Sequence, residues 1–286
     1  MSVKIISDST CDLSEELLKK YDITVLPLHI VLGDAEYKDL VEIKPDEIYQ
    51  WSNEHNDAPK TSAASISDAI ELFQTYGNTY DEIVCFSISG QMSTTVNVLR
   101  MAAEEIGMED RVFVVDSENL STGIGHLVVE AAIKAQNGMS GKEIAAYMEQ
   151  LKPRVKASFV VDTLTFLHRG GRCSGVAALA GSALKLHPKI VVEQGAMKPS
   201  KKYRGKMSSV ILNYVKDLEP SLKSAKTDRV FITHSGCSDE LLQSIHQEIE
   251  QLQLFDEIHI TRAGGVISSH CGPGTLGVIF IENETV

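Results

Sequence analysis

Short apolar runs rich in valine and isoleucine alternate along the chain with segments whose apolar residues recur at helical spacing. The runs predict β-strands, and their continuous apolar character is typical of strands covered on both faces. The helical spacing is clear at Ile66, Ala69, Ile70 and Phe73, which fall on one face of a helix. We expect strands at residues 3–7, 23–32, 82–87, 112–115, 158–161, 190–193, 230–233, 257–261 and 278–281.

Regular alternation of strand and helix predicts an α/β fold with largely parallel sheets. A boundary is expected close to Pro153, because proline disrupts the end of the helix that precedes it. The chain is therefore predicted to form an N-terminal α/β domain at residues 1–156 and a C-terminal α/β domain at residues 157–286.

Composition narrows the possible functions. No apolar run approaches the ~20 residues that span a membrane, and the first residues lead directly into a strand, so we expect a cytoplasmic protein. The formal net charge of −12 argues against nucleic acid as a partner. One basic stretch, residues 198–206, predicts either a solvated loop or a docking site for an anionic partner. The five cysteines form no Cys-x-x-Cys pair, so neither a metal site nor a disulfide framework is expected.

Two hydroxyl-rich loops lead into predicted helices, where ligands of α/β proteins bind. In the first, Thr61 and Ser62 precede a helix that Ser65 is placed to cap. These two hydroxyls either stabilise a turn or donate hydrogen bonds to an anion. In the second, Ser93 and Thr94 follow Gly90-Gln91-Met92 at the start of a helix. Ser93 either caps that helix or joins its N–H groups in binding a phosphate, sulfate or carboxylate.

Two further segments carry candidate chemistry. His270 and Cys271 precede a rigid Gly-Pro-Gly turn that would hold the imidazole in a fixed position. There His270 could donate a hydrogen bond to a carboxylate or exchange a proton near neutral pH. Arg169 and Arg172 flank two glycines, which suggests either a close backbone approach or an anion contact. The small apolar residues at 175–184 predict either a tightly packed helix or a helix that leaves room for an apolar ligand.

Catalytic motifs are missing from the sequence. Asp8 and Asp12 follow the first strand without the Asp-x-Asp spacing of aspartyl-phosphate enzymes, and Asp12 and Ser14 are expected to begin the helix at 13–20. The chain has no Gly-x-Ser-x-Gly elbow, no phosphate-binding P-loop and no His-Glu-x-x-His motif. Two alternatives stay open: a binding module for another small anion, and a hydrolase or transferase using His270 as base and Cys271 as nucleophile.

Taken together, these motifs resemble the DegV family, whose studied members are the fatty-acid-binding (FakB-type) subunits of bacterial fatty acid kinase. The matching segments are Ile5-Ile6-Ser7-Asp8-Ser9-Thr10-Cys11-Asp12-Leu13, Lys60-Thr61-Ser62, Ser89-Gly90-Gln91-Met92-Ser93-Thr94, Arg169-Gly170-Gly171-Arg172 and His270-Cys271-Gly272-Pro273-Gly274. Their order and spacing match from end to end. One departure is Ala64, where many relatives carry proline, and it changes the stiffness of the loop rather than the chemistry of Thr61.

The resemblance implies two α/β domains with one long-chain fatty acid between them and no other cofactor. The protein itself would be a non-catalytic subunit that presents the carboxylate to a separate ATP-dependent kinase, which makes acyl phosphate for phospholipid synthesis. Transient contact with a membrane would serve exchange of the acid. The residues expected at the carboxylate are Thr61, Ser62, Ser93, Thr94 and His270. Those expected along the acyl chain are Val176, Ala180 and Leu184. Those expected to face the kinase are Arg169, Arg172, Lys201, Lys202 and Arg204, with His270 and Arg204 assisting phosphoryl transfer.

Overall fold

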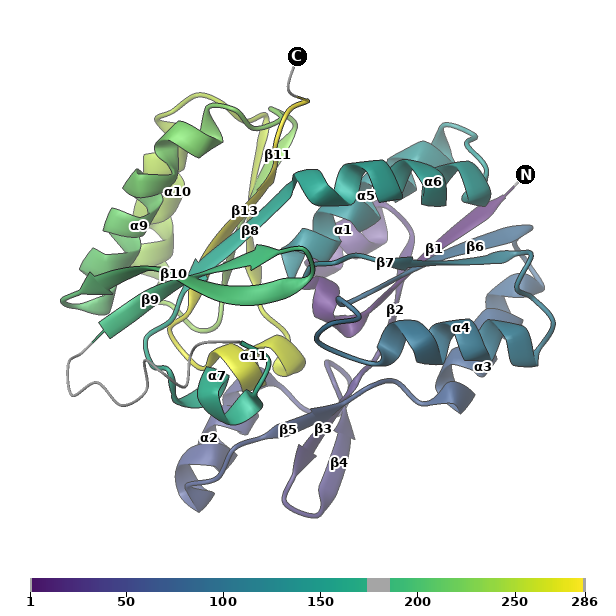
Figure 1. Ribbon diagram of the computed structural model, residues 1–286, viewed down its shortest axis with the longest axis horizontal. Helices are drawn as coiled ribbons and strands as arrows, with labels where there is room; N and C mark the ends of the chain where they lie inside the picture. Colours follow the sequence, from purple (N-terminus) through teal and green to yellow (C-terminus); the bar gives the residue numbers. More distant parts are fainter. Residues whose placement is uncertain (1, 174–185, 285–286) are drawn as a thin grey trace.

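The computed structural model describes residues 2–173 and 186–284 and has the α/β architecture expected from the sequence (Figure 1). Its N-terminal part contains a four-stranded, all-parallel sheet in the order β2-β1-β6-β7. The helices α5 and α6 cover one face of this sheet, and α3 and α4 cover the other (Figure 1). The strands are β1 (Val3–Asp8), β2 (Ile23–Leu26), β6 (Glu82–Ser87) and β7 (Val112–Asp116). The helices are η1 (Ser9–Cys11), α1 (Glu15–Lys20), α3 (Ile66–Gly77), α4 (Thr95–Glu105), α5 (Thr122–Gln136), α6 (Gly141–Leu151) and η2 (Lys152–Arg154).

The single strand expected at 23–32 is two strands in different sheets. After β2 the chain turns at Pro27, which has no N–H to donate to a sheet. It then forms a small antiparallel sheet in the order β4-β3-β5, followed along the chain by α2. These elements are β3 (His29–Leu32), β4 (Ala35–Lys38), α2 (Pro45–His55) and β5 (Lys60–Ser62). The small sheet places Thr61, on β5, opposite Ile30.

The C-terminal part contains a six-stranded sheet in the order β10-β9-β8-β13-β11-β12. Here the expectation of parallel pairing is wrong, because every neighbouring pair except β11 and β12 is antiparallel. The strands are β8 (Val155–Val160), β9 (Leu186–Glu193), β10 (Ala196–Arg204), β11 (Arg229–His234), β12 (Glu257–Arg262) and β13 (Leu276–Ile281). The helices are α7 (Thr165–Gly170), α9 (Met207–Leu222), α10 (Asp239–Glu250) and α11 (Gly265–Cys271), with α9 and α10 together on one face (Figure 1).

The helix α5 joins the two large sheets into one core. Its first eleven residues are all buried, and it packs on β1 and β6 of the parallel sheet and on β8 and β13 of the six-stranded sheet. A helix that is apolar on all sides is typical of such a central layer. The strand β8 begins at Val155, next to the expected boundary, and the division into domains at 156 and 157 stays a prediction. Within residues 2–173 and 186–284, no helix is both long and apolar enough to cross a bilayer.

Candidate functional site

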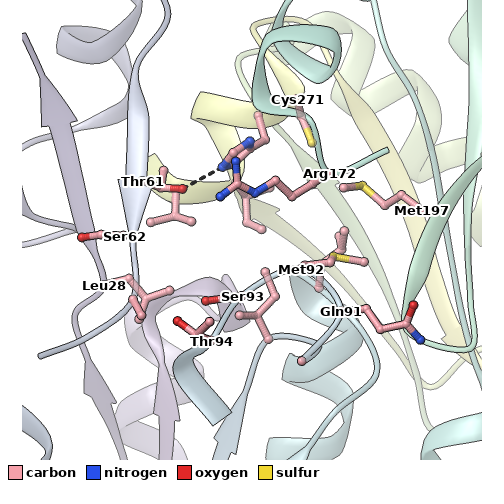
Figure 2. A pocket seen from close by; sticks show the side chains of 17 residues that line it. Leu28, Thr61, Ser62, Gln91, Met92, Ser93, Thr94, Arg172, Met197 and Cys271 are labelled. Carbon is pink, nitrogen blue, oxygen red and sulfur yellow. Dashed lines mark hydrogen bonds between the residues drawn. The ribbon is translucent and has the colours of Figure 1, made fainter. Parts of the chain in front are cut away.

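A cavity of about 420 Å³ lies where the small sheet, the loop between β6 and α4, and the helix α11 meet (Figure 2). Its volume is within the range of small-molecule sites. Hydroxyl, imidazole and guanidinium groups line it together with apolar side chains. The lining residues are Leu28, Thr61, Ser62, Ala63, Ile88, Gly90, Gln91, Met92, Ser93, Thr94, Leu120, Arg172, Met197, Val266, Ile267, His270 and Cys271.

Thr61 and His270 meet inside this cavity although they are 209 residues apart. The Thr61 hydroxyl lies 2.8 Å from Nε2 of His270, the hydrogen bond drawn from Thr61 in Figure 2. The other ring nitrogen, Nδ1, is buried and has no hydrogen-bond partner among the described residues. Gly170 allows this position of the ring, because a Cβ on Gly170 would lie 2.3 Å from Nδ1. The imidazole is therefore fixed at the wall with one polar contact inside the cavity.

Ser93 and Thr94 occupy the loop between β6 and α4. The helix begins at Thr95, one residue later than capping by Ser93 requires, and Thr94 takes the N-cap position without a side-chain hydrogen bond. The Ser93 hydroxyl accepts a hydrogen bond from the Thr95 N–H at 3.3 Å and lies 2.8 Å from the Thr95 hydroxyl. Ser93 is therefore not the N-cap of α4, and its hydroxyl borders the cavity.

Ser62 lies at the edge of the same cavity but its hydroxyl points elsewhere. Successive residues of a strand face opposite sides, and Ser62 is turned away from Thr61 (Figure 2). Its hydroxyl donates a hydrogen bond to Glu36 at 3.3 Å. Ser62 is accordingly less well placed than Thr61 to contact a ligand in the cavity.

The polar segment that precedes Gly-Pro-Gly is not a loop but the helix α11. Ser268 and Ser269 are buried, and their hydroxyls donate hydrogen bonds to the backbone carbonyls of Ala263 and Gly265. Cys271, at the last position of α11, borders the cavity. Burial raises the pKa of the Cys271 thiol to about 12, with a smaller contribution from the charge of Asp12. A thiol with such a pKa is a poor nucleophile at neutral pH, which weakens the alternative of a hydrolase or transferase.

The basic residues expected to face a partner are divided between two places. Arg172 borders the cavity and donates a hydrogen bond to the Gly170 carbonyl at 2.6 Å, and Arg169 is exposed nearby on α7. Lys201, Lys202 and Arg204 do not line the cavity. They are exposed on β10, and Lys201 forms an ion pair with Asp217 at 2.6 Å. Val176, Ala180 and Leu184 lie outside the described residues.

Sequence reasoning missed the hairpin formed by β9 and β10, which brings Met197 into the wall of the cavity. The basic stretch expected to be a loop is largely the strand β10. At the tip of the hairpin, the carbonyls of Gln194 and Gly195 accept hydrogen bonds from Gln91 and Ser89, at 2.5 Å and 2.7 Å. The hairpin thus fastens the C-terminal sheet to the loop that carries Ser93. The adjacent Gln-Gly at 194–195 was the available sequence signal for this turn.

His270 should remain uncharged at neutral pH. Burial, reinforced by the charge of Arg172, lowers its pKa from 6.5 to about 4. The unfolded chain then takes up a proton between pH 6.5 and 4 while the ligand-free folded protein does not, so His270 lowers the stability of the fold as the pH falls through this range. An NMR titration of the ligand-free protein, with His270→Ala to assign the resonance, should give a midpoint near pH 4. A midpoint near 6.5 would contradict this environment.

The model of a family of uncharacterised proteins, the DegV family, matches residues 2–283 of the chain. A DegV domain-containing protein of Clostridium acetobutylicum is 32% identical over 285 residues, which cover 98% of this chain and 99% of that protein. The protein DegV of Bacillus subtilis is 28% identical over 279 residues, covering 97% and 98% of the two chains.

Solved structures are similar over nearly the whole fold. One is described as fatty acid binding of a DegV family protein from Thermus thermophilus; it is 32% identical, with a TM-score of 0.90 over 99% of this chain and 100% of that chain. Another, a stearic acid-binding protein from Eubacterium ventriosum, is 28% identical, with a TM-score of 0.85 over 99% and 98%. Within the part of this chain that the structure describes, no group of three or more His, Cys, Asp or Glu residues is arranged to hold a metal ion.

Proposed function

This chain belongs to the DegV family, and from that premise we propose that it binds one long-chain fatty acid in the cavity described above. The observation that carries the proposal is that Thr61, Ser93, Thr94 and His270 line one cavity together with apolar side chains. A fatty acid has the same division between a carboxylate and an apolar tail. The fatty acid binding attributed to the structures from Thermus thermophilus and Eubacterium ventriosum supports the same ligand class.

The carboxylate is proposed to lie among the hydroxyls. A buried carboxylate must receive hydrogen bonds, and the hydroxyls of Thr61, Ser93 and Thr94 supply donors at the start of α4 and beside α11. Neutral His270 can donate its Nε2–H to the oxygen of Thr61, which leaves the Thr61 hydroxyl free to donate to the carboxylate. Ser62, whose hydroxyl donates to Glu36, is not included among these donors. Arg172 also borders the cavity and contributes positive charge without being enclosed.

The tail is proposed to supply most of the affinity. Burial of one methylene is worth about 0.8 kcal/mol, so a C16 chain offers on the order of 10 kcal/mol before the costs of association. Leu28, Met92 and Met197 belong to the apolar wall, and Val176, Ala180 and Leu184 are proposed to extend it. An acyl chain left in water would forfeit this gain.

The protein is further proposed to act as the substrate-binding subunit of a cytoplasmic fatty acid kinase and to need no cofactor. Its sequence lacks a P-loop, so the phosphoryl donor would be bound by a separate ATP-dependent subunit. That subunit would dock on the side of Arg169 and Arg172, with Lys201, Lys202 and Arg204 as further cations on β10. Cations near a phosphoryl group steer and stabilise it. Contact with a membrane would be transient and would serve exchange of the acid.

Native mass spectrometry of the purified protein tests ligand binding directly. We expect a retained adduct with the mass of a C16 or C18 acid, and stoichiometric rebinding of palmitate after removal of lipid. A protein that retains and rebinds only a phosphorylated metabolite would instead support the module for another anion.

The role in phosphoryl transfer is tested by reconstitution with a bacterial fatty acid kinase and ATP. We expect acyl phosphate only when both proteins are present. His270→Ala should lower turnover about tenfold or more while weakening acid binding less, because the imidazole steadies charge that develops during transfer. Arg204→Ala should raise the concentration of kinase needed for half-maximal rate without changing acid affinity. Acyl phosphate formation by the isolated protein would exclude a purely binding role.

A further inference from the structure

Two buried aspartates from the N-terminal part of the chain lie at the N-terminus of α11. Oδ1 of Asp12 accepts a hydrogen bond from the Gly264 N–H at 2.8 Å. Oδ1 of Asp39 accepts one from the Gly265 N–H at 2.8 Å, and its Oδ2 accepts one from Val266 at 3.4 Å. Asp12 is 4% exposed and Asp39 is fully buried. Three consecutive N–H groups at the start of α11 thus donate hydrogen bonds to side chains more than 220 residues away in sequence.

Each carboxylate is itself held in place by a hydroxyl. Ser121 donates to Asp12 at 2.5 Å, and Ser9 donates to Asp39 at 2.8 Å. Asp12 is not the first residue of a helix, as the sequence suggested; it ends η1 in a left-handed conformation, and Ser14 alone caps α1. Neither aspartate has an ion-pair partner in the part of the chain that the structure describes. Their contacts are all hydrogen bonds to neutral groups, centred on α11.

The glycines of α11 make this approach possible. A Cβ on Gly265 would lie 2.6 Å from Oδ1 of Asp39 and 2.4 Å from Cδ1 of Ile30. On Gly264, it would lie 3.3 Å from Oδ1 of Asp12. Gly264 also provides no side chain to cap the helix, so the two aspartates take the part that an N-cap residue normally plays. Burial raises the pKa of Asp12 to about 8 and that of Asp39 to about 6, so hydrogen bonds rather than full negative charge hold this end of α11.

We infer that Asp12 and Asp39 are positioning residues for the ligand site: they fix the N-terminus of α11 so that His270 meets Thr61. The inference rests on the proposed function. His270 lies five residues beyond Gly265, or about 7–8 Å along the axis. Over so short a helix, a displacement of one end by about 1 Å is transmitted to the other and exceeds the tolerance of a hydrogen bond. Both ends of α11 are therefore anchored to the N-terminal part, one by carboxylates and one by Thr61.

A double-mutant cycle tests this link. Asp12→Asn and Asp39→Asn are each made in the wild-type and in the His270→Ala background, and the dissociation constant for palmitate is measured for all. Each asparagine variant should weaken binding at least fivefold in the wild-type background and less than twofold in the His270→Ala background. Equal losses in both backgrounds would overturn the inference, since the aspartates would then act independently of His270.

The ligand-free protein provides a second readout. The NMR signal of His270 Nε2 should move in both asparagine variants towards its position in Thr61→Ala, because all three changes break the same hydrogen bond. An unmoved signal would overturn the inference. This readout needs no fatty acid and therefore tests the link from the aspartates to His270 separately. Failure of the wild type to bind palmitate would reject the proposed function, while the NMR signal would still decide whether that link exists.

Glu130→Gln is the matched control. Glu130 is another buried acid, but it pairs with Arg229 at 2.6 Å and is remote from α11 in sequence and contacts. This variant should lower the melting temperature without changing the His270 signal or the affinity for palmitate. If it changed both as much as the aspartate variants do, their effects would be general consequences of destabilisation, and the inference would be overturned. If Asp12→Asn does not fold, Ser121→Ala takes its place, because Ser121 donates a hydrogen bond to Asp12. We expect a two- to threefold loss of affinity, and an unchanged affinity would contradict the role of Asp12.

Discussion

Replacing both Thr61 and Ser93 by alanine should nearly abolish palmitate binding. Each change removes a hydroxyl at the proposed position of a buried carboxylate, and an unsatisfied buried charge costs about 1–3 kcal/mol per lost hydrogen bond. The two losses together correspond to roughly a 30-fold to 10⁴-fold increase in the dissociation constant. Calorimetric titration of the lipid-free protein measures this effect, and each single variant should show about half of it in free energy.

Ser62→Ala is the control for this pair. It removes a neighbouring hydroxyl from the same strand, but one that donates to Glu36 and is turned away from Thr61 (Figure 2). We expect less than a threefold change in affinity. Unchanged affinity in both Thr61→Ala and Ser93→Ala would reject these residues as carboxylate ligands.

A tryptophan at position 197 should exclude long acyl chains. Met197 is 3% exposed and faces the cavity from β10, so the larger ring would occupy space proposed for the tail. Displacing three or four methylenes would cost about 2–3 kcal/mol, or roughly 30- to 150-fold in affinity. Competition binding with acids of C8 to C18 should show the largest loss for the longest chains.

Met101→Trp makes the same substitution on α4, where the side chain is 54% exposed and outside the cavity. Its acid profile should match that of the wild type. If Met197→Trp also bound C8 and C18 acids as the wild type does, the tail would have to follow a path that avoids β10.

The polar side of the site was accessible from sequence because hydroxyls that precede helices mark ligand-binding loops in α/β proteins. Thr61 and Ser93 were identified in this way and His270 from the Gly-Pro-Gly turn that follows it, and the structure brings all three to one cavity. That they meet depends on the pairing of β5 with β3 in a separate small sheet. The hydrophobic pattern could not reveal this separate sheet, because residues 23–32 form a largely apolar run in which only Pro27 marks the break between β2 and β3.

In the C-terminal part the apolar runs predicted every strand except β10, but they did not predict the directions of the strands. The strand β10 contains Lys198, Lys201 and Lys202, a pattern typical of a solvated loop. It nevertheless pairs with β9 on both sides of an irregularity between Pro199 and Lys202. The direction of each strand follows from its neighbours in the sheet, and sequence order does not give that arrangement. The antiparallel pairing of β13 with both β8 and β11 is a consequence of tertiary structure alone.

The short helix α11 shows a third limit. Its serines suggested a polar loop, but their hydroxyls are buried and donate to the nearby backbone carbonyls of Ala263 and Gly265. The acceptors for its N-terminal N–H groups come from Asp12 and Asp39, at the other end of the chain. Local propensity therefore gave the wrong secondary structure where distant residues provide the cap.

The place of β13 in the six-stranded sheet also determines when this protein can fold during its synthesis. The strands of the parallel sheet end at Asp116 and its covering helices α5 and α6 end at Leu151, so this part can form while the ribosome is still translating the rest. The six-stranded sheet cannot close so early, because β13 lies between β8 and β11 and is its last strand to be made. Until then β8 and β11 expose apolar edges that invite aggregation. A stop codon just before Leu276 would therefore remove the middle of this sheet rather than its border.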